Sequence, residues 1–124
     1  MQSGKIGTEI PNNESLSGGI DIRDFKIVAI VLPETWAGTS ITFQAKVNEE
    51  WDTGTPSQGE PQPEQWKNVY DDLGNELTVV VAANRIVGLD TYAGVLAALR
   101  YIRIRSGTST TPVNQSPGKV IQLF

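Results

Sequence analysis

Two pairs of neighbouring carboxylates are the residues of this chain whose type and spacing could do chemistry. Glu49 is followed by Glu50, and Asp71 is followed by Asp72. Two carboxyl groups on either side of a sugar linkage can serve a glycosidase, one as acid and the other as base or nucleophile. However, sequence neighbours on a strand point to opposite faces of the sheet, and neighbours in a loop are usually solvated. We therefore predict that neither pair is catalytic.

The sequence also lacks the residues that other kinds of catalysis need. The sequence contains no cysteine and no histidine, so it has no thiolate nucleophile and lacks the commonest general base and metal ligand. A calcium site can be drawn at Asp71, Asp72 and Asn75, but these residues lack the order of an EF-hand loop, and ordinary turn chemistry is the alternative. We expect no enzymatic activity, no cofactor and no metal.

Strands of alternating polar and apolar side chains must position the remaining polar residues. In residues 100–105 the two isoleucines should face a core. The side chains of opposite parity should face away from it, and these are Tyr101, Arg103 and Arg105. Residues 40–47 show the cleanest alternation of the chain, and residues 119–123 form a short last strand. One face of these strands therefore meets a core and the other meets something polar or acidic.

Further strands are predicted by short runs between turn signals. The most apolar run, residues 25–32, is predicted as a strand buried on both faces. In residues 76–81, Val80 lies between alternating apolar residues and suggests that the other face is partly covered. Residues 90–99 form one or two helical turns with Asp90 or Thr91 as the N-cap. Weaker strand patterns occupy residues 16–22, 67–70 and 85–89. Together these predict an all-β fold, an antiparallel β-sandwich or jelly roll of about eight strands with at most one short helix.

Length and charge bound the organisation of the chain. Its 124 residues suffice for one domain with a core of its own. We predict a flexible N-terminal arm at residues 1–8, with an edge strand at residues 6–10 as the alternative, and a single domain at residues 9–124. The net charge of −4 argues against nucleic acid as the main partner. No apolar run approaches the length of about 18 residues that predicts a membrane span, so we expect no membrane as partner.

Residues 48–65 are predicted as a long acidic loop rich in proline and glycine. Trp51 lies inside this loop and Trp66 follows it directly. Such a loop either hangs in solvent at the tip of a hairpin or contacts a partner. Acidic residues gather in the first half of the chain and arginines gather late. This distribution suits contacts between copies of the chain, and it equally suits ordinary surface charge.

Several stretches carry a resemblance to known proteins. The most specific are IRIRSGT at residues 102–108 and PVNQ at residues 112–115. Weaker ones lie at residues 32–36, 41–45 and 69–76. In this order, over about residues 9–124, they resemble small structural proteins of tailed bacteriophages and prophages, which have a tight hairpin in place of residues 48–65. A second resemblance, carried by ITFQA and by RYIRI at residues 100–104, is to galactose-binding-like jelly-roll domains and implies a fold rather than an activity.

The phage resemblance implies a structural protein of the virion, assembled in the host cytoplasm. It points to a head decoration or cement protein that binds the major capsid protein and forms a homo-oligomer, for which we expect a trimer. Trp51, Trp66 and Tyr70 would anchor the partner, and Arg103 and Arg105 would pair with acidic groups across a subunit boundary. Exposed strand charge of little energetic weight is the alternative for both arginines. Two other functions stay open, a carbohydrate-binding module of a phage fibre or surface protein and a neck or tail component.

Overall fold

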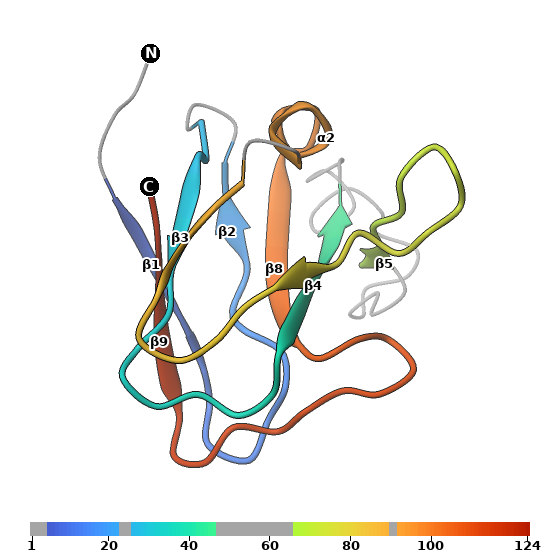
Figure 1. Cartoon of the computed structure of the whole chain (residues 1–124). Coiled ribbons are helices and arrows are strands. Elements are labelled where there is room, and N and C mark those ends of the chain that lie inside the picture. The colour runs from blue at the N-terminus through green and yellow to red at the C-terminus, as the bar shows by residue number, and fades with distance from the viewer. Residues whose placement is uncertain (1–4, 23–25, 47–65, 90–91) are drawn as a thin grey trace, which may run out of the picture.

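Two antiparallel β-sheets form a β-sandwich in the computed structural model of the chain (Figure 1). The structure describes residues 5–22, 26–46, 66–89 and 92–124. The four-stranded sheet runs in the order β1 (Ile6–Ile10), β9 (Lys119–Leu123), β3 (Ala29–Val31) and β7 (Ile86–Gly88). The all-β sandwich predicted from the alternation of side chains is confirmed.

The strands β4 (Ser40–Lys46) and β8 (Tyr101–Ser106) form the centre of the five-stranded sheet. They pair along their length, from Ile41 opposite Ser106 to Lys46 opposite Tyr101. β2 (Ile20–Asp21) pairs with β8 on one side. β5 (Lys67–Asn68) and β6 (Val79–Val80) pair with opposite ends of β4 on the other side. The strands predicted most clearly, β4, β8 and β9, are confirmed to within a residue at each end.

The core lies between the two sheets and follows the predicted alternation. From the five-stranded sheet, Phe43 on β4 and Ile102 and Ile104 on β8 are fully buried. The opposite sheet supplies Ile30 and Leu123, which are also fully buried. Burial of each such side chain contributes about 1.5–3 kcal/mol to folding. Because these side chains point inward, the alternate residues of β4 and β8 lie on the outer face, where the candidate site is found.

Two burial predictions are wrong, for the same physical reason. Phe25 lies outside the described residues, and residues 26–32 do not form one strand buried on both faces, because only residues 29–31 are in β3 and Val28 is 42% exposed. Val80 is 77% exposed, so the outer side of its segment is not covered. A sandwich of two layers buries one face of each sheet, and an apolar residue on the outer face therefore stays accessible.

A single short helix, α2 (Ala93–Ala97), lies in the described part of the chain, at the end of the sandwich where β8 begins (Figure 1). Its N-cap is Tyr92, which makes no side-chain cap hydrogen bond. The expected caps, Asp90 and Thr91, lie outside the described residues. Leu96 docks the helix onto the core with 2% of its surface exposed. No helix in the described ranges has the length and hydrophobicity that crossing a membrane requires.

The N-terminal boundary follows the alternative left open by the sequence. β1 begins at Ile6 and pairs with β9 from Ile6 opposite Leu123 to Ile10 opposite Lys119. Residues 6–8 therefore belong to the sheet rather than to a free arm. The predicted strand at residues 16–22 is reduced to β2 and a single bridge from Leu16. Residues 1–4 of the predicted arm and the whole predicted loop at residues 48–65 lie outside the described residues.

The loop after β8 folds back onto the sandwich through Gly107 and Gln115. Gly107 has a φ of 88° and forms a bridge with Pro112. The Gln115 side chain is fully buried. Its Nε2 donates to the Ala37 carbonyl oxygen at 2.8 Å and to the Ser106 Oγ at 2.6 Å, and its Oε1 accepts from the Ala37 amide at 3.0 Å. Residues 107–115 thus close one end of the fold.

Candidate functional site

The outer face of the five-stranded sheet stacks a tryptophan on two cations. The Arg103 guanidinium carbon lies 4.5 Å from the centre of the Trp66 ring. The Lys46 Nζ lies 5.3 Å from the centre of the same ring. The residues come from β8, from the residue before β5 and from the last position of β4. Each cation–π contact of this kind contributes about 0.5–2 kcal/mol, depending on how far it is desolvated.

A glycine near β2 lets the Trp66 ring lie across the sheet. A Cβ added at Gly19 would lie 3.1 Å from the Cη2 and 3.2 Å from the Cζ2 of Trp66. These separations are tighter than ordinary van der Waals contact, so a larger residue would push the ring away. β8 and β4 lie between β2 and β5 in the sheet, so the Trp66 side chain extends from beside β5 toward β2. Gly19, which lies in the weak strand pattern predicted at residues 16–22, thus makes room for Trp66.

Tyr101 extends the aromatic and cationic arrangement along β8. Its ring centre lies 5.6 Å from the Lys46 Nζ and 5.9 Å from the Arg100 guanidinium carbon. Lys46 and Tyr101 are direct partners in the pairing of β4 with β8. We call this surface the cationic face, which consists of Lys46, Trp66, Arg100, Tyr101 and Arg103.

Arg103 at the centre of this face is held by uncharged groups. Its Nε donates to the Gln44 Oε1 at 2.8 Å, and the Gln44 Nε2 donates in turn to the Asn68 Oδ1 at 3.0 Å. Burial lowers the pKa of the Arg103 guanidinium, and the neighbouring Arg105 lowers it further. An arginine still stays charged near neutral pH. The face therefore presents a partly buried positive charge whose partners in the described part of the chain, Gln44 and Trp66, are neutral.

Arg105 points to the same side of the sheet as Arg103, as the alternation predicts, but it is not part of the cationic face. It is only 6% exposed. Its Nη1 lies 3.2 Å from the Glu76 Oε2, and its Nη2 donates to the Asn68 Oδ1 at 2.7 Å. The other oxygen of Glu76 accepts hydrogen bonds from the amide and the hydroxyl of Ser109. Arg105 is thus paired within its own chain, and neither exposed strand charge nor a contact across a subunit boundary describes its position.

Of the other two expected anchors, only Tyr70 lies in the described part of the chain, and it does not join Trp66 and Arg103. Trp51 lies outside the described residues. Tyr70 is 50% exposed and belongs to the hairpin at residues 70–77, which faces α2. Sequence reasoning missed the contribution of Lys46, because the last residue of a predicted strand gives no sign of which ring it meets. The sequence could have identified Tyr101 as part of this face, because Tyr101 and Arg103 are two residues apart and point to the same side of the strand.

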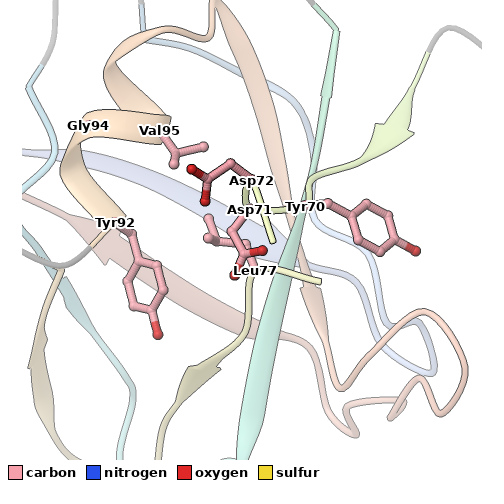
Figure 2. A pocket seen from close by; sticks show the side chains of 7 residues that line it. All are labelled: Tyr70, Asp71, Asp72, Leu77, Tyr92, Gly94 and Val95. Atoms are coloured by element: carbon pink, nitrogen blue, oxygen red, sulfur yellow. The ribbon is translucent and has the colours of Figure 1, made fainter. Parts of the chain in front are cut away.

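A cleft of about 660 Å³ between this hairpin and α2 is the second candidate site (Figure 2). It is lined by Tyr70, Asp71, Asp72, Leu77, Tyr92, Gly94 and Val95. The Asp71 Oδ1 accepts from the amides of Leu73 and Asn75, both at 2.9 Å, which is the turn chemistry offered as the alternative to calcium. The Tyr92 hydroxyl donates to the Thr78 carbonyl oxygen at 2.8 Å. Two of the polar groups of the cleft therefore serve the fold itself.

The cleft does not arrange its carboxylates for chemistry. Figure 2 shows the carboxylates of Asp71 and Asp72 turned apart and the ring of Tyr70 directed away from the other lining side chains. Within the described residues, no group of three or more acidic side chains is placed to hold a metal ion. A sugar site needs polar groups that converge beside an aromatic floor. The cationic face is therefore the stronger candidate for a binding function.

We find no match to this chain among protein-family models, curated proteins or solved structures.

Proposed function

We propose that this chain is a structural protein of a tailed-phage virion that decorates the head and stabilises it by binding subunits of the major capsid protein. The resemblance of the sequence to phage structural proteins supports the phage assignment. The single structural observation that supports the binding role is Arg103 held under Trp66 on the outer face of the five-stranded sheet. The cationic face binds an acidic surface of the neighbouring capsid subunit.

The chemistry of the cationic face favours an acidic protein surface as its partner. Three cations, Lys46, Arg100 and Arg103, gather around two aromatic rings on a chain whose net charge is −4. A guanidinium binds a carboxylate through two parallel hydrogen bonds, and these are stronger where water is partly excluded. Tryptophan, tyrosine and arginine are also the residues that contribute most to protein interfaces.

The face is also held in place before any partner binds. Gln44 and Trp66 restrain the Arg103 guanidinium from two sides, and the Trp66 ring lies against the backbone at Gly19. Ordering a flexible side chain at an interface costs about 0.5–1.5 kcal/mol. Because much of this ordering has already taken place in the free protein, a larger share of the contact energy contributes to binding.

The location of the protein in purified particles tests the phage assignment. We expect peptides of this chain to co-purify with phage particles in many copies per particle, as measured by quantitative mass spectrometry after a density gradient. Density for the chain on the head lattice in cryo-electron microscopy supports decoration, whereas density at the neck or tail supports the alternative structural role. Recovery only in the particle-free fraction of the lysate contradicts a virion protein.

Charge reversal at Arg103 tests the role of the cationic face. We expect Arg103→Glu to weaken binding to heads that lack this protein by about 30-fold or more, because loss of an interface anchor costs about 2 kcal/mol or more. Co-sedimentation with purified heads measures the affinity. Lys67→Glu is the matched control, because it reverses an exposed charge on β5 of the same sheet. Equal weakening by both variants would show that net charge, rather than this face, controls binding.

A carbohydrate-binding module is the second candidate function, and the cleft in Figure 2 is the observation that favours it. Its volume suits a small ligand, and Tyr92 and Val95 supply part of an apolar wall. Titration with neutral oligosaccharides, followed by nuclear magnetic resonance, should shift the signals of Val95 and Leu77 if this function holds. Shifts confined to the cationic face, or no shifts at all, would rule out carbohydrate binding in the cleft.

A further inference from the structure

The outer face of the four-stranded sheet is apolar and open to solvent. Ile86 on β7 is 73% exposed and Val120 on β9 is 53% exposed. Both side chains point away from the core, because the next residue along each strand, Val87 or Ile121, packs inward against it. Phe124, which follows β9, continues the same parity and is 39% exposed. Exposed apolar side chains that gather on one surface mark an interaction site more often than isolated ones do.

The pairing of the strands brings these side chains into neighbouring rows. Val31 pairs with Ile86 on one side and with Gln122 on the other, so one row crosses the sheet. A second row joins Ala29 to Gly88 and, through backbone hydrogen bonds, to Phe124. We call this surface the apolar face, which consists of Ala29, Val31, Ile86, Gly88, Val120, Gln122 and Phe124.

The apolar face has both projections and hollows. Ile86, Val120 and Phe124 project from it, whereas Ala29 and Gly88 leave space between them. A Cβ added at Gly88 would meet nothing within 4 Å. Two sheets that pack face to face interdigitate large side chains with small ones about 10 Å apart. The surface therefore has the relief that packing against a second sheet requires.

Charge decides what kind of partner can cover each of the two outer faces. In a two-fold contact every patch meets its own copy, so a patch of like charges would repel itself. The cationic face is less suited to meeting itself, because Lys46 and Arg103 would approach their own copies, with Asp21 of β2, opposite Tyr101, as an acidic neighbour. On the apolar face, the outward positions of β1, β3, β7 and β9 carry a single charged side chain, Glu9 on the edge strand β1. This face can meet its own copy without bringing rows of like charge together.

We propose that a second copy of this chain covers the apolar face, with the two four-stranded sheets packed face to face about a two-fold axis. The contact leaves both cationic faces accessible for another partner. The side chains of the four-stranded sheet favour this dimer contact whether or not the protein belongs to a phage. A two-fold contact gives a dimer, whereas the phage resemblance implied a trimer.

The size of the face predicts a contact that depends on concentration. Strands about 4.8 Å apart and about five residues long present a projected area of at most ~300 Å² across four strands. Stable interfaces bury about 800 Å² of accessible surface per partner, so this contact lies at the weak end unless loops add to it. We therefore expect monomer at low concentration and dimer at high concentration.

Sedimentation velocity across a concentration series, with light scattering for the mass, tests the dimer. We expect Ile86→Asp to raise the dissociation constant at least about tenfold, because it places a charge, and under the two-fold a like charge, in an apolar contact. Val80→Asp is the matched control, because Val80 is 77% exposed, equally apolar and on the other sheet. It should leave dimerisation unchanged, and both variants should keep the unfolding midpoint of the wild type.

Cross-linking is a second test of the dimer, and its cysteine variants place no charge in the contact. The natural chain has no cysteine, so Ile86→Cys and Val80→Cys each provide one thiol. A short bismaleimide should link two copies of Ile86→Cys and leave Val80→Cys monomeric. A wild type that stays monomeric at the highest concentration, a wild-type trimer, or equal cross-linking of both variants would overturn the proposal. None of these results bears on whether the chain co-purifies with virions, so the two proposals can fail separately.

Discussion

Gly107→Ala is expected to reduce the free energy of unfolding by about 3–5 kcal/mol, which combines the cost of a left-handed alanine with that of overpacking. Gly107 has a φ of 88°, where side chains with a Cβ are strained. A Cβ there would lie 2.5 Å from the Thr111 carbonyl oxygen and 2.8 Å from the Val113 amide nitrogen. Both atoms belong to the backbone and cannot rotate away. Urea unfolding followed by tryptophan fluorescence measures the loss.

Gly74→Ala is the matched control for this prediction. Gly74 has the same φ of 88°, but a Cβ added there would meet nothing within 4 Å. Its substitution should therefore cost only the conformational strain of about 1–2 kcal/mol. If both variants lose the same free energy, the close approach of residues 111–113 does not contribute, and the loop after β8 is less tightly packed than the structure shows.

Breaking the buried pair of Arg105 and Glu76 is expected to cost about 3–5 kcal/mol of unfolding free energy, whichever partner is changed. The side chains are 8% and 14% exposed, so removing one charge leaves the other with little water. Arg105→Met strands the Glu76 carboxylate, and Glu76→Gln strands the guanidinium beside Thr42 and Asn68. Urea unfolding of each single variant measures the cost.

The double variant distinguishes a stranded charge from simple loss of packing. Arg105→Met combined with Glu76→Gln leaves no buried charge at this site, and the glutamine still accepts from Ser109 as the glutamate does. We expect the double variant to be more stable than either single variant. Arg103→Met, two residues earlier on β8, should cost only about 1 kcal/mol, because its main interactions are the partly buried stack on Trp66 and one hydrogen bond to a neutral group. Additive losses in the double variant would contradict a coupled pair.

The alternation of polar and apolar side chains was enough to predict the main strands and the fold class. β4, β8 and β9 each show alternation over five or more residues, because one row of each must enter the core. The same signal was misleading at residues 25–32. There a continuous apolar run suggested burial on both faces, but β3 lies in a sheet with an open outer face, and Val28 and Val31 are not buried.

The candidate site was predictable only in part. Trp66 and Arg103 were named from the sequence, but nothing in their spacing of 37 positions shows that they touch. Their contact depends on β5 pairing with β4 and β4 with β8, and on Gly19 leaving room for the ring. The apolar face was not predicted at all, because exposed valine and isoleucine cannot be told from buried ones by residue type.

Arg103 and Arg105 show most clearly what the sequence by itself determined and what only the tertiary structure decided. Alternation along β8 correctly sent both side chains to the face opposite Ile102 and Ile104. It could not show that Glu76 and Ser109, from two distant segments, cover one arginine while the other is stacked on Trp66 and only partly buried. The direction of a side chain is a local property of the strand. What lies over that side chain depends on segments far away in the chain, which only folding brings together.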